Sequence, residues 1–296
     1  MESILFVSHE KALCGVYDFG RNIADALQAS HKFRFVFVEC KSAADLEHAI
    51  RAHAPKAIIY NHYRSTMPWL TRAVLNLHPL PHVGILHEVT QEVADRATNE
   101  LFDFHIAPDP SLLLRNPIVF KTGRLLPSYE NRAAVPSLPT IGSFGFGTAG
   151  KGFEALVARV QQEFDEAAIR LRIPFATFGD ATGQNARDIA ERCRKLVTKP
   201  GISFECQHEF LSTEGVLDFL AGNSLNAFCY EAKAGRGISS AIDYALAVKR
   251  PIAITKSSMF RHVFSASPPI TIEDSSLREI LGRGFAPLAG YVAEWT

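Results

Sequence analysis

The hydrophobic pattern of the first half alternates short, continuous apolar runs with longer segments whose apolar residues recur at helical spacing. Apolar runs without a polar face are typical of parallel strands that are buried on both sides. The predicted strands are Ile4–Ser8, Phe33–Cys40, Lys56–Asn61, His82–His87, Phe104–Ala107 and Ile118–Lys121. The predicted helices between them are Tyr17–Ala29, Ala43–Ala52, Pro68–Leu77 and Gln91–Leu101. This alternation predicts a doubly wound α/β domain.

A polar, proline-containing break separates this half from a second half with the same pattern. Residues Pro127–Pro139 include three prolines and are predicted to be a linker. The sequence therefore predicts two Rossmann-like domains, residues 1–130 and residues 138–296, that face a cleft. The strands predicted after the linker are Thr140–Phe144, Ile173–Phe178, Ile202–Cys206, Leu225–Tyr230 and Pro251–Thr255. The helices predicted there are Gly152–Phe164, Ala186–Leu196, Thr213–Leu220, Ile238–Ala247 and a C-terminal helical segment from Ser275 to Thr296.

Composition and charge narrow the class of protein. Hydrophobic residues make up 47% of the 296 residues and charged residues 21%, as expected of a globular chain with buried cores. Lys plus Arg and Asp plus Glu number 31 each, so the basic excess of a nucleic-acid-binding protein is missing. The five cysteines form no C-x-x-C pair, which favours reduced thiols in a cytoplasmic protein and predicts no zinc site. No run approaches the ~18 apolar residues of a membrane-spanning helix.

Ligands of doubly wound folds bind where helices follow the carboxyl ends of strands, so these turns are the candidates for chemistry. The turn Ser143–Gly152, SFGFGTAGKG, combines glycines that allow a ligand close to the backbone with Lys151 beside a predicted helix start. Unpaired N–H groups at a helix start attract anions, and Lys151 adds a positive charge. The turn is therefore predicted to bind a phosphate. The alternative is that its glycines only pack the helix on the strand.

Two general nucleotide-binding motifs fit this turn in part. Gly145, Gly147 and Gly150 satisfy the G-x-G-x-x-G pattern of dinucleotide-binding proteins. Asp180, at the end of the next predicted strand, is then the candidate for the acid that binds the ribose. The turn also nearly satisfies the P-loop pattern, but Gly152 replaces the Ser or Thr that would hold Mg²⁺. An NAD(P)-dependent protein therefore stays an alternative, whereas a P-loop nucleoside triphosphatase is disfavoured.

The turn that follows the next-to-last predicted strand is a second candidate for phosphate binding. Its sequence, YEAKAGRGISSA, spans Tyr230–Ala241. Ser239 and Ser240 offer hydroxyl and N–H groups at a predicted helix start, and Arg236 would neutralise a phosphate. The alternative is an ordinary helix capped by serine.

These turns resemble the donor site of GT-B glycosyltransferases, in particular family 4. Lys151 and Gly152 match the K-G pair with which the family binds the donor diphosphate, and Phe146 stands where the family has an Arg. The segment Ala245–Thr255, ALAVKRPIAIT, is similar to the family's E-A-M-A-x-G-x-P-V-V-A-S, although neither of the family's two Glu residues is matched. The resemblance implies a nucleotide-sugar donor bound by Gly15, Phe146, Gly147, Lys151, Arg236, Gly237, Ile238, Ser239 and Ser240.

Two strand ends in the first half resemble the acceptor side of the same family. Asn61 and His62 stand where the family has an H-x-H segment after a strand, and His87 matches a histidine that lies near the donor sugar. The resemblance implies that His87 orients the reacting sugar, that Glu88 acts as base or acceptor ligand, and that Asn61 and His62 lie on the acceptor side. A structural role is the alternative for each histidine.

The function predicted from these features is the transfer of a sugar from a UDP- or GDP-sugar to a glycan, lipid or small molecule. Helix N-termini and cations would stabilise the leaving diphosphate, so no metal or other cofactor is expected. The resemblance implies retention of the anomeric configuration. Two alternatives stay open: a non-catalytic binding protein with the same fold, which Phe146 at the Arg position favours, and an NAD(P)-dependent oxidoreductase, which would use Asp180.

Overall fold

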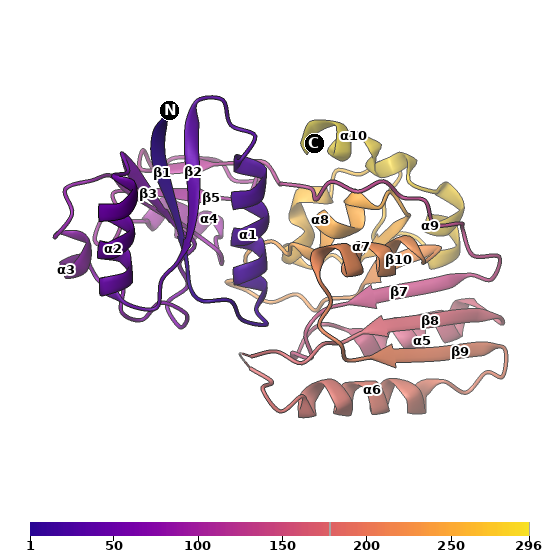
Figure 1. The fold of residues 1–296 in the computed structure, drawn as a ribbon. Coiled ribbons are helices and arrows are strands. Elements are labelled where there is room, and N and C mark those ends of the chain that lie inside the picture. The colour runs from indigo at the N-terminus through magenta and orange to yellow at the C-terminus, as the bar shows by residue number, and fades with distance from the viewer. Residues whose placement is uncertain (178, 296) are drawn as a thin grey trace. The chain divides into compact units, whose positions relative to one another are not determined.

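The computed structural model describes residues 1–177 and 179–295, which form two compact units. The first unit contains Met1–Arg124 together with Gly235–Gly237. The second unit contains Leu125–Ala234 and the described residues from Ile238 onward. Each unit is built around its own parallel β-sheet, and Figure 1 labels helices and strands of both. The chain therefore contains the two doubly wound α/β sheets that its hydrophobic pattern predicts.

The sheet of the first unit has six parallel strands in the order β2-β1-β3-β4-β5-β6. Strand β1, which lies between β2 and β3, is fully buried at Leu5, Phe6 and Val7, which explains the continuous apolar run at the start of the sequence. In the register of the sheet, Phe6 pairs with Phe37 on one side and with Ile59 on the other. The strands are β1 (Glu2–Ser8), β2 (Phe33–Glu39), β3 (Ala57–Tyr60), β4 (His82–Ile85), β5 (Phe104–Ala107) and β6 (Val119–Lys121).

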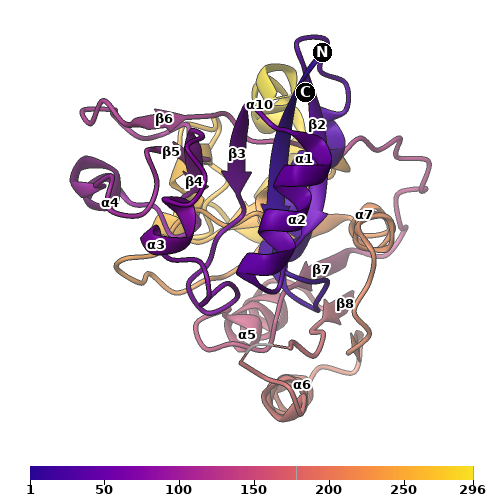
Figure 2. The same ribbon diagram turned by 60° about the vertical axis from the view of Figure 1, so that its left-hand side comes forward.

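Helices cover both faces of this sheet. Helix α1 (Gly15–Leu27) packs on one face through Ala24, in a cluster with Phe6 and Ile85. Helices α2 (Ala43–His53) and α3 (Arg72–Leu75) pack on the opposite face, as Figure 2 also shows. Helix α4 (Gln91–Arg96) follows β4. The predicted helices Pro68–Leu77 and Gln91–Leu101 are shorter than expected, because Thr71 caps the start of α3 and Ala97 leaves the helical conformation after α4.

The sheet of the second unit has five parallel strands in the order β11-β10-β7-β8-β9. The strands β7 and β10 lie side by side, so the turns that follow them share one region of the sheet edge. The strands are β7 (Thr140–Phe144), β8 (Ala167–Arg172), β9 (Ile202–Gln207), β10 (Leu225–Phe228) and β11 (Ile252–Ile254).

The second strand of this unit lies earlier in the chain than predicted. The structure has β8 at Ala167–Arg172, whereas the predicted strand was Ile173–Phe178, whose last residue lies outside the described residues. Buried and half-buried residues alternate along β8, so it lacks the continuous apolar run that guided the prediction. The guanidinium groups of Arg170 and Arg172 lie over the Phe219 ring, 5.1 and 5.4 Å from its centroid, which makes these two polar positions compatible with a central strand.

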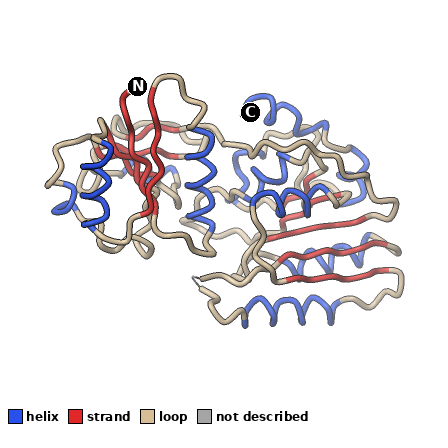
Figure 3. Tube along the Cα trace, in the orientation of Figure 1, coloured by secondary structure: helices blue, strands red, loops and turns tan. Residues whose placement is uncertain are grey.

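Helices also cover both faces of the second sheet, as Figure 3 shows by secondary structure. One cluster of buried residues joins α5, α6 and α9 to the sheet, and a second cluster joins α7, α8, α10 and the 3₁₀ helices η1 and η2 to its other face. The described helices are all too short or too polar to cross a lipid bilayer. Their bounds are α5 (Phe153–Glu163), α6 (Gln184–Leu196), α7 (Thr213–Ala221), α8 (Ala241–Ala247), η1 (Ser258–Val263), α9 (Leu277–Arg283), η2 (Ala286–Leu288) and α10 (Ala289–Trp295).

Candidate functional site

The turn between β7 and α5 depends on a glycine at its last position. Gly152 has φ 66°, a left-handed conformation that favours glycine, and it stands directly before α5. A Cβ atom added to Gly152 would lie 1.8 Å from the carbonyl oxygen of Cys229, just after β10. The glycine therefore allows the start of α5 to lie against the end of the neighbouring strand.

Lys151 of this turn lies against the residues that open the second predicted turn. Its Nζ is 3.9 Å from the centroid of the Tyr230 ring, a cation–π contact. The backbone N–H of Glu231 donates to the carbonyl oxygen of Gly150 at 2.9 Å. A Cβ atom added to Gly150 would lie 3.5 Å from Oε2 of Glu231, so this exposed carboxylate also borders the turn. The predicted site did not include Glu231, although its position directly after a strand was a signal for it.

Helices α5 and α6 begin in the same way but differ in what binds their first N–H groups. Both follow a glycine in the left-handed region, Gly152 and Gly183. At α6, the carboxylate of Asp180 accepts hydrogen bonds from the N–H groups of Asn185 and Ala186, at 3.0 and 2.9 Å. In the described part of the chain, no side chain accepts a hydrogen bond from the first-turn N–H groups of α5. Helix α5 is therefore the one of this pair whose start can bind an external anion.

The prediction that Asp180 binds the ribose of NAD(P) is wrong. Strand β8 ends at Arg172, so Asp180 does not stand at a strand end. Its side chain is 5% exposed, and both of its carboxylate oxygens bind the start of α6. A dinucleotide site needs this acid at the end of a strand, where it reaches the ribose hydroxyl groups. The glycine spacing alone therefore carries no argument for NAD(P).

Phe146 and Gly147 pack the first turn on its surroundings. The Phe146 ring stacks with the ring of Phe210, 6.0 Å between centroids and 29° between planes. A Cβ atom added to Gly147 would lie 2.7 Å from Cα of Ala186 at the start of α6. Phe146 thus forms an aromatic contact at the position where the resemblance has a cation. The predicted contacts of Phe146 and Gly147 with a donor stay predictions.

The second predicted turn begins its helix later than expected. Helix α8 starts at Ala241, three residues after the predicted Ile238. The N–H of Ser239, before the helix, donates to the carbonyl oxygen of Met259 at 2.9 Å. The hydroxyl oxygen of Ser239 accepts a hydrogen bond from the N–H of Ala241 at 3.3 Å. Ile238, Ser239 and Ser240 are all half-buried. Their roles in donor binding stay predictions.

Asn61 is buried inside the first unit, where its side chain joins the ends of two strands to α1. It is 0% exposed, and its Nδ2 donates to Oγ of Ser8 and to the carbonyl oxygen of Val16, at 3.0 and 2.7 Å. A Cβ atom added to Gly20 would lie 2.1 Å from the same Nδ2, so α1 packs directly on this amide. This burial corrects the prediction that Asn61 contacts an acceptor: it fixes α1 against the ends of β1 and β3.

His87 follows β4 and lies among aromatic rings, with centroid distances of 5.4 Å to Phe19 and 6.5 Å to Tyr63. Its Nε2 is buried, and no described group forms a hydrogen bond with it. Burial, followed by repulsion from His62 and His9, lowers the pKa of His87 to about 3. Burial also lowers the pKa of His62. The imidazole of His87 is therefore neutral near pH 7.

Glu88 binds the segment Gly235–Gly237, which belongs to the first unit. Its Oε2 accepts a hydrogen bond from the N–H of Gly237 at 3.0 Å, and its Oε1 lies 3.1 Å from Nη2 of Arg236. A Cβ atom added to Gly237 would lie 2.6 Å from the carbonyl oxygen of His87. The charge of Arg236 is therefore balanced by a carboxylate in this structure, and the predicted roles of Arg236 in donor binding and of Glu88 as base or acceptor ligand stay predictions.

The loop between β1 and α1, which contains the residue before Gly15, gives less information about a ligand. Gly15 is the first residue of α1 and is exposed. The residue before it, Cys14, makes no side-chain capping bond to the helix. The predicted donor contact of Gly15 stays a prediction.

Comparison with known proteins places this geometry in a fold family. No family model matches the chain, and no curated protein sequence matches it. HepE from Anabaena, solved with UDP and glucose, is similar with a TM-score of 0.64 and 14% identity, over 96% of this chain and 89% of that chain. A glycosyltransferase from Rickettsia africae has a TM-score of 0.60 at 9% identity, over 88% and 81% of the two chains.

A third solved structure extends the likeness over the whole chain. An alpha-glucosyltransferase in complex with UDP has a TM-score of 0.58 at 11% identity, over 100% of this chain and 92% of that chain. At such low identities the likeness shows the fold. The chain has the GT-B fold of two Rossmann-like domains, which confirms the fold class predicted from its sequence.

Proposed function

We propose that the protein is a glycosyltransferase whose nucleotide-sugar donor places its diphosphate at the start of α5. The observation that carries the proposal is the contrast between two helix starts in one sheet. The start of α6 is occupied by the Asp180 carboxylate, whereas the start of α5 has no such partner among the described residues and stands directly after Lys151 and Gly152. A helix N-terminus beside a lysine suits a diphosphate.

The proposed donor is a UDP-sugar. The similar structures of HepE are titled as complexes with UDP, with UDP-glucose and with UDP and glucose, and the alpha-glucosyltransferase structure as a complex with UDP. The fold is common to these proteins and to this chain, and we propose the same class of donor here by analogy of fold, with Lys151 at the α5 start as the local feature that fits it. A GDP-sugar is the alternative that the binding test below distinguishes. The acceptor is a glycan, a lipid or a small molecule.

The proposed reaction breaks the bond between the anomeric carbon and the diphosphate oxygen and forms a bond from that carbon to the oxygen of an acceptor hydroxyl, whose proton passes to the leaving diphosphate. The N–H groups of α5 and the Lys151 ammonium would stabilise the negative charge that develops on the leaving diphosphate, without a requirement for a metal ion. We propose that Glu231, beside the same turn, binds a hydroxyl group of the donor sugar. The neutral His87 would form a hydrogen bond with a hydroxyl group of the reacting sugar, as donor or as acceptor. The proposed reaction retains the anomeric configuration.

The proposal is tested by thermal stabilisation with UDP, GDP, CMP, ADP and NAD⁺. A ligand that binds the folded protein raises its melting temperature by mass action. UDP is expected to give the largest increase in melting temperature. A second assay uses mass spectrometry to detect glucose, which we expect the protein to release slowly from UDP-glucose by hydrolysis. If GDP raises the melting temperature most, the donor is a GDP-sugar. If NAD⁺ alone raises it, the proposal is overturned.

A non-catalytic binding protein is the second candidate, and two contacts favour it. Phe146 stacks with Phe210 where the resembling family has an arginine, and Arg236 is paired with Glu88. With no arginine at position 146 and with Arg236 in an ion pair, Lys151 is the cation that the described turn before α5 offers to a diphosphate. Binding of UDP together with no release of sugar from any UDP-sugar or GDP-sugar, at high enzyme concentration, would support this candidate over the transferase.

A further inference from the structure

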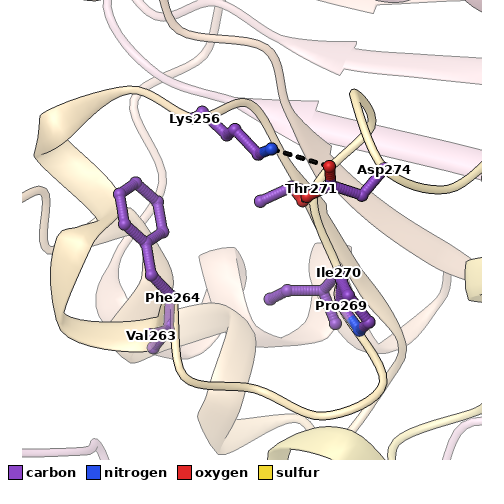
Figure 4. Close-up of a pocket in the computed structure, with 7 residues that line it drawn as sticks. All are labelled: Lys256, Val263, Phe264, Pro269, Ile270, Thr271 and Asp274. Carbon is purple, nitrogen blue, oxygen red and sulfur yellow. Dashed lines mark hydrogen bonds and ion pairs between the residues drawn. The ribbon is translucent and has the colours of Figure 1, made fainter.

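The cavity near the end of η1 does not select a class of ligand. Its volume is about 210 Å³, and residues 269–274 form one of its walls (Figure 4). Nζ of Lys256 lies 2.6 Å from Oδ1 of Asp274, and the Glu273 carboxylate accepts a hydrogen bond from the backbone N–H of Lys256 at 2.9 Å. An anion would meet two carboxylates near this ion pair, and a cation would meet Lys256. A more specific group lies at the carboxyl ends of the strands of the same unit.

His208, in the loop after β9, has one ring nitrogen fixed as a hydrogen-bond donor. Its Nδ1 lies 2.8 Å from the carbonyl oxygen of Ile173, the residue directly after β8. A carbonyl oxygen can only accept a hydrogen bond, so Nδ1 carries the hydrogen atom, and Nε2 of the neutral imidazole is an acceptor. Among the described residues, none forms a hydrogen bond with this Nε2, and the atom is accessible to solvent.

Packing holds the imidazole in this orientation. Its ring stacks on the ring of Phe175, with 5.2 Å between the centroids and 18° between the planes. The guanidinium carbon of Arg187 lies 4.9 Å from the centroid of the same Phe175 ring. A Cβ atom added to Gly183 would lie 2.3 Å from this ring, so the residue before α6 packs closely on it. The acceptor at Nε2 is therefore preorganised for a donor that comes from a ligand.

An aromatic pair joins the loop of His208 to the turn before α5. Phe210, two residues after His208, stacks with Phe146, and Phe146 belongs to the same turn as Lys151. Both rings are half-buried, so each keeps surface that a ligand can cover. Planar nucleobases stack favourably on aromatic side chains. A nucleotide with its diphosphate at the α5 start would find an aromatic surface and a hydrogen-bond acceptor in the loop after β9.

We propose that His208 selects the base of the donor nucleotide. Its Nε2 accepts a hydrogen bond from a ring N–H at the edge of the base, and the base lies against Phe146 and Phe210. Uracil at N3 and guanine at N1 present such an N–H group. Cytosine at N3 and adenine at N1 present a lone pair, so Nε2 would face a second acceptor. The proposal rests on the proposed function, because the base is that of the nucleotide bound at α5.

The test measures dissociation constants by calorimetry with the full chain, at pH 7.5. The probes are UDP, CDP and N3-methyl-UDP, in which a methyl group replaces the hydrogen of the ring N–H. CDP and N3-methyl-UDP are each expected to bind about tenfold or more weakly than UDP, because neither can donate to Nε2. For purines, GDP is expected to bind about tenfold more tightly than ADP. Equal dissociation constants of UDP, CDP and N3-methyl-UDP would overturn the proposal.

Two variants separate the hydrogen bond from stacking. His208→Phe keeps a planar ring on Phe175 but removes the acceptor, so UDP should bind about tenfold more weakly and no better than CDP. Phe210→Ala should weaken UDP and CDP by the same factor, because stacking tolerates any base. Phe204→Ala is its control: Phe204 is also half-buried and has a cation–π contact, with Arg194 at 5.6 Å, but it lies within β9. An unchanged ratio of UDP to CDP affinity in His208→Phe, with the fold intact by circular dichroism, would refute the role of His208.

A last variant separates this proposal from the proposed function. Lys151→Ala should weaken UDP and CDP by the same factor, because both nucleotides carry the diphosphate. If UDP affinity depends on Lys151 and not on His208, the donor site at α5 stands and the base contact is wrong. If none of these nucleotides binds the parent protein, both proposals fail.

Discussion

Both sheets are parallel and carry their candidate site residues at the carboxyl ends of the strands, but these residues differ in charge between the two units. In the second unit, the edge presents Lys151 and the first N–H groups of α5. In the first unit, the residues that follow the corresponding strand ends include the buried His9 and the half-buried His62 and His87, whose pKa values are all lowered by burial. We propose that the edge of the second unit binds an anion and that the edge of the first unit binds neutral polar groups such as sugar hydroxyls. The common fold supplies the position, and the local residues decide the ligand.

The contrast between α5 and α6 shows the same point within a single sheet. Gly152 and Gly183 have similar left-handed backbone conformations, but the helix start that follows is open in one case and bound by the Asp180 carboxylate in the other. A glycine turn before a helix is therefore not sufficient to predict a phosphate site. The residues that reach the first N–H groups must also be known.

The largest expected effect is the loss of stability in Gly152→Ala. The new Cβ would meet the carbonyl oxygen of Cys229, a backbone atom that has no freedom to move away, in addition to the strain of a left-handed alanine. The free energy of unfolding is expected to fall by about 3–5 kcal/mol, measured by urea denaturation. Gly179→Ala is the control, because Gly179 also has a positive φ but has nothing within 4 Å of an added Cβ. Similar losses in both variants would contradict the close contact at Gly152.

The second effect concerns affinity for UDP. Lys151→Ala removes the cation beside the α5 start, so the dissociation constant of UDP, measured by calorimetry, should rise about tenfold to hundredfold. Lys151→Arg should restore much of the affinity. Lys195→Ala, a change at an exposed lysine on α6, should have no effect. If both alanine variants bind UDP like the parent protein, the diphosphate is not at Lys151.

A third prediction concerns the filled helix start. Asp180→Ala removes the acceptor of two backbone hydrogen bonds at α6, and its free energy of unfolding should fall by about 1–2 kcal/mol. UDP affinity should stay unchanged, because α6 is not the proposed donor site. Weaker UDP binding in this variant, with α6 intact by hydrogen exchange, would show that the two helix starts are not independent.

The smallest expected effect is the pH dependence that His87 confers. Its pKa is lowered from 6.5 to about 3 in the folded protein, so between these pH values the unfolded chain binds a proton that the native protein does not. The contribution of His87 to stability is complete above about pH 6.5 and declines as the pH falls toward 3. At pH 5.5, the parent protein should lose about 1 kcal/mol more than His87→Gln, relative to pH 7.5. Equal losses would mean that His87 is accessible to protons.

The sequence predicted most of the fold because most strands carry a signal that depends on local residues alone. Strands β5 and β7 have the predicted bounds, since their apolar runs are short and end sharply. Strand β8 was missed because Arg170 and Arg172 interrupt its apolar run, and the long-range contact that places both over the Phe219 ring leaves no signal in the sequence. Because this strand was predicted too late in the chain, Asp180 was predicted to lie at a strand end, whereas β8 ends at Arg172.

The candidate site was less predictable, because its decisive contacts join residues far apart in the chain. The contact of Lys151 with Tyr230 and the ion pair of Arg236 with Glu88 leave no periodic pattern in the sequence. The burial of Asn61 under Gly20 likewise depends on how α1 packs on the sheet. The resemblance supplied the position of Lys151, whereas the partners of Arg236, Glu88 and Asn61 required the structure.

A crystal structure of the protein with UDP is the most direct test of the central claim, which is that the start of α5 binds a diphosphate. Phosphate oxygens are expected within about 2.7–3.2 Å of the first-turn backbone nitrogens of α5. Nζ of Lys151 is expected to move from the Tyr230 ring to a phosphate oxygen. A diphosphate bound at the start of another helix, with α5 and Lys151 free of contact, would contradict it.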